Sequence, residues 1–65
     1  MNVGANVRKM RLERNMTQEE LGKEVSVSFS MISQVERGTK ALSIQLAKEL
    51  ADFFGCTTDD FLKDD

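Results

Sequence analysis

The chain has 65 residues, enough for a single domain over 1–65 with a small core. Charged residues make up 31% of it and hydrophobic residues 40%, a balance typical of a folded globular domain rather than a disordered chain. It has no apolar run of about 18 residues that could span a membrane and no apolar signal-peptide core, so a cytoplasmic protein is expected.

The residue types exclude most kinds of site chemistry. The chain has one cysteine, Cys56, and no histidine, so an internal disulfide is impossible and a zinc site is not expected. We interpret Cys56 as a small buried hydrophobe. The usual serine, cysteine and histidine catalytic arrangements are missing, as is a Gly-rich phosphate loop. We therefore expect neither an enzyme nor a cofactor.

The net charge of −2 is unevenly distributed along the chain. Residues 1–48 carry eight Lys and Arg against five Glu, a net charge of +3. Residues 49–65 carry one Lys against six Asp and Glu, a net charge of −5. Partner binding depends on the local field, so the overall negative charge does not exclude an anionic partner. We interpret the acidic end as a solubilising surface.

A first helix is predicted over residues 3–14. Val3, Val7 and Met10 recur at the spacing of one helical face. Asn15 follows the last turn, and asparagine tolerates the left-handed conformation that often ends a helix.

A second helix is predicted over about 18–25. Thr17 and Glu20 have the spacing of a capping box, in which each side chain accepts a backbone N–H of the other residue. Gly22 inside the helix is unfavourable by itself, and close approach of the following helix would explain it. Ser26 ends the helix at a position where a positive φ is expected.

A third helix is predicted over about 29–37, with Ser28 as its N-cap and Gly38 after its end. Ile32 and Val35 point inward. Two short helices joined by a tight turn form a helix-turn-helix over about 18–37.

A strand is the competing interpretation for residues 25–31, which alternate apolar and polar side chains. No second strand of similar quality is available to pair with it, and a lone strand leaves its backbone groups unpaired. We therefore favour the helix-turn-helix.

Two further elements complete the chain. After a linker over 39–42, Ser43 caps a fourth helix of about 44–54, which Gly55 ends. Residues 57–60 resemble a second capping box, with aspartate in place of glutamate. They predict a short fifth helix, and the two apolar residues expected to point from it into the core are Phe61 and Leu62.

Several segments in this order and spacing resemble the Cro and phage-repressor type of helix-turn-helix DNA-binding regulators, also called the XRE family. They are Val7-Arg8-x-Met10-Arg11, Thr17-Gln18-Glu19-Glu20-Leu21, Val27-Ser28, Ile32-Ser33-x-Val35-Glu36-Arg37-Gly38, Leu50-Ala51 and Phe54-Gly55-Cys56-Thr57-x-Asp59-x-Phe61-Leu62. The resemblance covers about residues 4–62. It implies an all-α, five-helix lambda-repressor-like domain that binds double-stranded operator DNA, usually as a homodimer on a palindromic site, and regulates transcription, with repression the expected effect.

The resemblance also implies roles for particular residues. The base-reading positions on the exposed face of the third helix are Ser28, Phe29, Ser30, Ser33 and Gln34. The phosphate-contacting positions are Gln18, Arg37, Thr39 and Lys40. Within the first set, Gln34 is the side chain that can bond adenine at two atoms. Phe29 departs from the family pattern, where a polar residue is usual, and it either packs into the core or stays exposed to touch thymine methyls or a protein.

A salt bridge and a dimer interface are expected as well. In the family the positions of Arg11 and Glu36 form an ion pair that joins the first and third helices. Phe53 lies beside the core stripe of the fourth helix, where apolar residues already suffice, so we expect it to be exposed. With Leu42 and Phe61 it is our candidate dimer surface.

Two alternatives use the same fold without reading DNA. A protein-interaction module, such as an antitoxin or anti-repressor-like protein, is favoured by the low net basicity, the acidic C-terminal third and Phe29 if exposed. A dimerisation domain serving a larger protein is a weaker alternative. No membrane association and no small-molecule ligand are expected.

Overall fold

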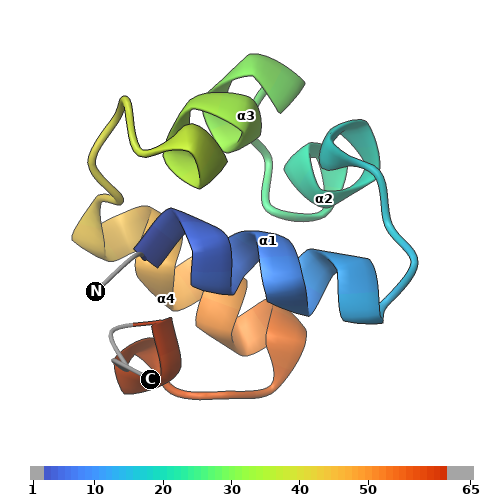
Figure 1. The fold of residues 1–65 in the computed structure, drawn as a ribbon. Coiled ribbons are helices and arrows are strands. Elements are labelled where there is room, and N and C mark those ends of the chain that lie inside the picture. The colour runs from blue at the N-terminus through green and yellow to red at the C-terminus, as the bar shows by residue number, and fades with distance from the viewer. Residues whose placement is uncertain (1–2, 62–65) are drawn as a thin grey trace.

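The computed structural model describes residues 3–61 and shows an all-helical domain (Figure 1). Its elements are α1 (Val3–Glu13), α2 (Gln18–Glu24), α3 (Phe29–Arg37), α4 (Ile44–Phe54) and a 3-10 helix η1 (Thr58–Phe61). The described residues contain no strand, so the helix-turn-helix interpretation of residues 25–31 is correct. In Figure 1, α1 runs through the middle of the domain, with α2 and α3 on one side and α4 on the other. None of the helices within 3–61 has the length and apolar character needed to cross a membrane.

The helix ends follow the predicted capping chemistry. The Thr17 hydroxyl accepts the Glu20 N–H at 3.1 Å, and the Glu20 carboxylate accepts the Thr17 N–H at 2.8 Å, which completes the capping box. Ser28 and Ser43 cap α3 and α4 in the same way through their hydroxyls. Ser26 has the predicted positive φ, at 61°. These caps satisfy donors that the first turn of a helix leaves without partners.

The fifth helix is the element that differs from expectation, and the five-helix count is not confirmed. Over the described range it is one turn of 3-10 helix. The Asp60 carboxylate accepts the Thr57 N–H at 3.0 Å, but the Asp60 N–H bonds the Thr57 carbonyl at 3.1 Å rather than the hydroxyl. The capping box is therefore only half formed. Leu62, expected to point into the core, lies outside the described residues.

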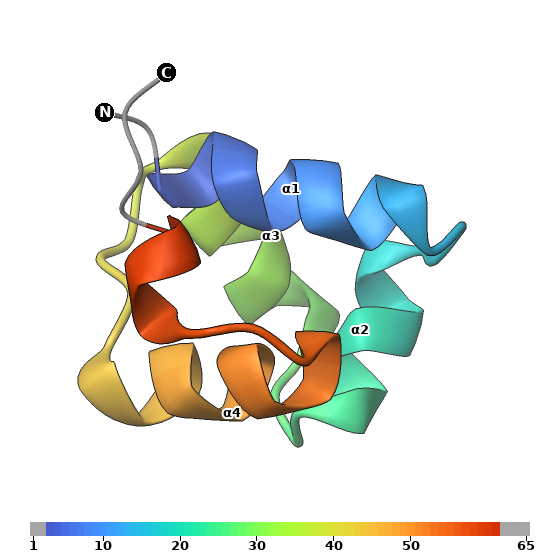
Figure 2. The same ribbon diagram turned by 90° about the horizontal axis from the view of Figure 1, so that it is seen from below.

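Every helix contributes one or more side chains to the hydrophobic core. The fully buried side chains are Val7, Leu21, Ile32, Leu50 and Phe61. Seen from below, η1 lies between α1 and α4 and closes this side of the core (Figure 2). The Asn6 side-chain amide donates to the Phe61 carbonyl at 2.7 Å and fixes η1 against α1. The first and last described elements are thereby joined.

Two helical glycines mark places where backbones approach closely. A Cβ on Gly4 would overlap the Val35 carbonyl oxygen, because α1 crosses the end of α3 at this point. A Cβ on Gly22 would lie 2.6 Å from the Val27 carbonyl oxygen. The Ser28 carbonyl carbon and oxygen would each lie 3.3 Å away, so Gly22 makes room for the turn and for the N-cap of α3, the following helix whose approach was expected. These contacts set the positions of α1 and α2 relative to α3.

Candidate nucleic-acid interface

The turn between α2 and α3 is held by backbone hydrogen bonds and by the packing of one apolar side chain. The Val25 N–H donates to the Leu21 carbonyl at 3.2 Å, and the Val27 N–H donates to the Gly22 carbonyl at 2.9 Å. The Val27 side chain is half-buried against the core. The orientation of α3 relative to α2 is therefore fixed by the turn and not only by side-chain packing.

α3 buries one face and presents the other. Ile32, Val35 and Glu36 are buried. Of the predicted base-reading residues, Ser30, Ser33 and Gln34 lie off this buried face, whereas Ser28 and Phe29 stand at the N-terminal end of α3. Ser28, Phe29 and Ser30 are exposed, and Ser33 and Gln34 are half-buried. The Phe29 side chain is 56% exposed, so it does not belong to the core. The Ser28 hydroxyl accepts the Met31 N–H at 3.1 Å, so capping α3 already uses that side chain.

A buried ion pair fixes the base of α3. Arg11 donates from Nε to Glu36 Oε2 at 2.7 Å and from Nη2 to Oε1 at 3.0 Å, the bidentate geometry that favours this pair. Its Nη1 donates to the Met16 carbonyl at 2.6 Å. Hydrogen bonding to Glu36 raises the pKa of the Arg11 guanidinium, which therefore stays charged across the physiological range. The ion pair expected between α1 and α3 is therefore present.

The first residue of α2 joins the same network. The Gln18 Nε2 donates to Glu36 Oε1 at 3.1 Å. Gln18, expected to contact phosphate, is half-buried, and its amide nitrogen is directed toward the ion pair. One carboxylate thereby connects α1, α2 and α3, so the start of α2 and the face of α3 are held in one arrangement.

The segment after α3 carries the remaining predicted contacts. Arg37, Thr39 and Lys40 are all exposed. The Gln34 carbonyl accepts the Thr39 N–H at 3.0 Å, and the Thr39 hydroxyl donates to it at 3.3 Å. Gly38, with a φ of 79°, allows the chain to reverse here. Two cations thus lie at the C-terminal end of α3 on a segment held by hydrogen bonds.

This geometry agrees with a match to a family model. The model described as "Helix-turn-helix" matches residues 7–61. The chain belongs to the XRE-type helix-turn-helix family. Family and fold are those of DNA-binding regulators, which are not enzymes.

Known proteins and solved structures resemble this helix-turn-helix domain. An uncharacterized HTH-type transcriptional regulator of Methanocaldococcus jannaschii is 41% identical over 46 residues, which are 71% of this chain and 70% of that protein. The P22 c2 repressor, solved in complex with a synthetic operator, superposes with a TM-score of 0.91 at 32% identity, over 100% of this chain and 98% of that one. The clp gene regulator ClgR of Corynebacterium glutamicum gives a TM-score of 0.86 at 31% identity, over 94% of this chain and 65% of that one.

The three residues predicted to form a dimer surface are not exposed in the structure. Phe53, expected to be exposed, is half-buried, and its ring centroid lies 5.4 Å from that of Phe54. Phe61 is completely buried, and Leu42 is half-buried. The most exposed large apolar side chain described is instead Ile44, which is 83% exposed at the start of α4.

The sequence analysis also missed two cross-links of the domain. The Arg14 guanidinium donates to the Phe54 carbonyl at 2.5 Å and lies 4.8 Å from the centroid of the Phe54 ring. A basic residue near the end of α1 and an aromatic residue 40 positions later give no local signal of such a contact. The second is the Asn6 bond to Phe61 described above. Both bring the C-terminal elements against α1, behind the interface.

Proposed function

We propose that this chain is a cytoplasmic DNA-binding transcriptional regulator, acting as a repressor, that inserts α3 into the major groove of a palindromic operator as a homodimer. The observation that carries the proposal is the exposed face of α3, supported from behind by the buried Arg11–Glu36 pair. In the helix-turn-helix, the second helix enters the major groove while the first crosses the backbone. The likeness to the P22 c2 repressor, solved with an operator, supports this role.

Reading and anchoring are assigned to different residues. Gln34 offers the amide that can bond adenine N6 and N7 together, and exposed Phe29 offers apolar contact to thymine methyls. Arg37 and Lys40 supply charge for phosphates, which set the register without reading sequence. Thr39 and Gln18 are the other two residues that we assign to phosphate contacts. Gln18 would make its contact through the polar groups of its side chain that are not bonded to Glu36.

The test compares one reading and one anchoring variant on a selected operator and on random duplex. Operator selection from random duplexes supplies the site. Gln34→Ala should weaken operator binding by about 1–3 kcal/mol and leave random DNA almost unaffected. Lys40→Ala should weaken both and lower the salt slope by about one unit. Gln45→Ala and Lys9→Ala are matched controls, because both residues are exposed on other helices.

Two results would reject the assignment of roles. One is an unchanged ratio of operator to random affinity in Gln34→Ala, and the other is a changed ratio in Lys40→Ala. Binding that does not weaken as salt rises would argue against phosphate contacts altogether.

The homodimer follows from the operator geometry that we propose. A palindromic site presents two half-sites about 34 Å apart, which a two-fold pair of domains matches. Sedimentation of the protein with an operator and with a half-site would measure the stoichiometry. One domain per complete operator would reject this part of the proposal.

Exposed Phe29 also supports a second candidate, a protein-interaction module of the antitoxin or anti-repressor type. An aromatic side chain that is 56% exposed is a common anchor at protein interfaces. Failure of the wild type to bind any duplex at low salt would favour this candidate over the regulator.

A further inference from the structure

A large apolar side chain stands exposed where α3 begins. Phe29 is the first residue of this helix, and its ring is exposed to solvent. Ser28 before it has a φ of −72° and a ψ of 157°, and its hydroxyl accepts the Met31 N–H at 3.1 Å. This N-cap fixes the backbone of Phe29 as the start of the helix. The ring therefore projects from a defined position at the N-terminal end of α3.

The surface next to this ring is polar. Ser28 and Ser30 are exposed on either side of Phe29 in the sequence. Ser33 follows one helical turn later, at the spacing that places two side chains side by side on a helix. Serine side chains are short, so the aromatic ring extends beyond the hydroxyls around it.

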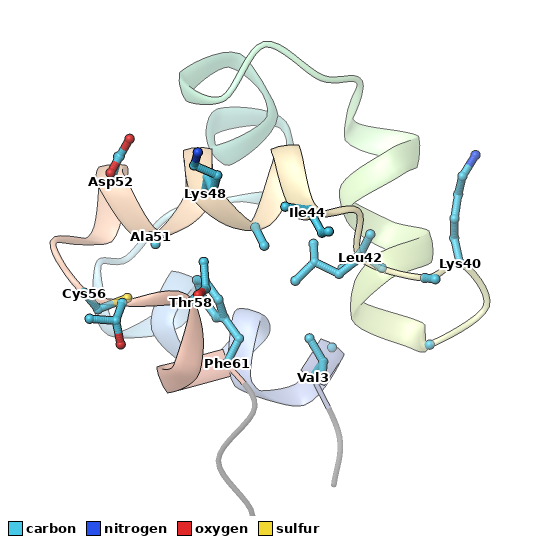
Figure 3. A pocket seen from close by; sticks show the side chains of 16 residues that line it. Val3, Lys40, Leu42, Ile44, Lys48, Ala51, Asp52, Cys56, Thr58 and Phe61 are labelled. Carbon is cyan, nitrogen blue, oxygen red and sulfur yellow. The ribbon is translucent and has the colours of Figure 1, made fainter.

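The other large apolar side chains that residues 3–61 expose belong to different helices. Leu12 lies on α1, and Ile44 lies at the start of α4. Ile44 borders a groove that Phe61 also lines, whereas Phe29 does not border it (Figure 3). Phe29 is therefore a lone apolar group among hydroxyls at the end of α3, rather than a member of a broad apolar patch.

A lone ring fits a small apolar target better than a protein surface. A stable protein interface buries about 800 Å² per partner around clustered anchors. In the major groove, by contrast, the apolar group on a base edge is a single methyl, at C5 of thymine. Recognition helices contact base edges with their N-terminal residues, and Phe29 lies at that end. Apolar wedges that unstack bases enter from the minor groove, which is not where α3 is proposed to lie.

A phenylalanine ring cannot distinguish thymine from 5-methylcytosine. The two bases differ at position 4, where thymine has a carbonyl acceptor and cytosine has an amino donor. Phe29 has no side-chain donor or acceptor with which to bond either group. Both bases carry a methyl group at C5, on the same edge of the major groove. Uracil and unmodified cytosine have a hydrogen atom in its place.

We propose that Phe29 reads the C5-methyl group of a pyrimidine, so that this chain binds an operator more tightly when the cytosine facing Phe29 is methylated at C5. The inference rests on the proposed function and extends its contact between Phe29 and thymine to a modified base. Burial of one methyl group raises affinity about threefold to fourfold. A palindromic operator presents the position once in each half-site, so two methyl groups raise affinity about tenfold or more.

Four operator duplexes test the proposal. Operator selection with the wild type and with Phe29→Ala identifies the pyrimidine position whose preference depends on Phe29. That position is then made thymine, uracil, cytosine or 5-methylcytosine in both half-sites, and fluorescence anisotropy gives each dissociation constant. The wild type should bind the thymine duplex about tenfold more tightly than the uracil duplex, and the 5-methylcytosine duplex about tenfold more tightly than the cytosine duplex. The opposite base is the same within each pair, so only the methyl group changes.

Three variants assign the effect to the ring. Phe29→Ala should abolish both methyl preferences, and Phe29→Leu should retain part of each because it keeps an apolar side chain. Leu12→Ala is the matched control, since Leu12 is an exposed apolar residue of α1, and it should keep both preferences. Phe29 is exposed, so its variants should fold, and circular dichroism checks this.

Several results would overturn the proposal while leaving DNA reading by Gln34 intact. They are equal affinity within both pairs, a preference for thymine that 5-methylcytosine does not share, and a selection that finds no position dependent on Phe29. Methyl preferences that persist in Phe29→Ala would also overturn it, because they would come from DNA shape. A wild type that binds no duplex at low salt would reject the proposed function and this inference with it.

Discussion

Replacement of Glu36 by alanine is the sharpest test of how the face of α3 is supported. The Glu36 side chain is 2% exposed and accepts two hydrogen bonds from Arg11 and one from Gln18. Glu36→Ala removes all three bonds and leaves the guanidinium, whose side chain is 9% exposed, with the Met16 carbonyl as its described acceptor. The free-energy loss is dominated by this uncompensated charge rather than by the bonds themselves.

The magnitude follows from the burial of both partners. Removing one side of a buried ion pair costs about 3–5 kcal/mol, and both side chains here are within a tenth of full burial. A domain of this size loses about 4 °C or more of Tm per kcal/mol, so the lower end already predicts a fall of about 12 °C. That loss is a large part of the total stability expected for 65 residues, about 3–10 kcal/mol.

Thermal and urea unfolding followed by circular dichroism would measure the effect. Glu49→Ala is the matched control, because this glutamate is exposed on α4 and its removal should change stability by less than about 0.5 kcal/mol. Glu36→Gln should fall between the two, because it keeps acceptor capacity while losing the charge. A Tm for Glu36→Ala within a degree of the wild type would refute the reasoning.

Two backbone predictions concern the remaining constraints on α3. Gly4→Ala should lower the free energy of unfolding by about 1–3 kcal/mol, because the new Cβ would overlap the Val35 carbonyl oxygen. This loss should exceed the gain from the better helix propensity of alanine. A variant that urea titration shows to be more stable than the wild type would contradict the contact. Ser26→Gly should raise the free energy of unfolding by about 0.5–1 kcal/mol, because φ is 61° at that position. Gly38→Ala, at a φ of 79°, should lower the free energy of unfolding by about 1 kcal/mol. A change of the same sign for both substitutions would show that the positive φ does not determine their effect on stability.

Local signals in the sequence predicted most of the fold. The capping residues Thr17, Ser28 and Ser43 each begin a helix where expected, and Gly38 and Gly55 each end one. These signals act over three or four residues, so sequence spacing is enough to recognise them. The exception is η1, whose described residues form a 3-10 turn rather than an α-helical one, with the Asp60 carboxylate accepting the Thr57 N–H as in a capping box.

Contacts between distant segments could not be predicted in the same way. The approach of Gly4 to the end of α3 and the placement of Arg14 on Phe54 depend on how helices cross, which no local pattern encodes. Burial on α4 was misjudged for a related reason. Phe53 is half-buried and packs against the core, whereas Ile44 is exposed in the first turn of α4. The Arg11–Glu36 pair was expected because the family resemblance, rather than the spacing of its residues, implied it.

The bond between Asn6 and Phe61 has a consequence for the order in which the domain is made. The positions assigned to DNA lie between residues 18 and 40, so all of them leave the ribosome before Phe61 does. Until residue 61 is available, the core position of its fully buried ring is vacant, and apolar surface of α1 and α4 that it covers faces water. A nascent chain therefore carries every position assigned to DNA, and the contacts that place α3, before the side chain that completes its core has been made.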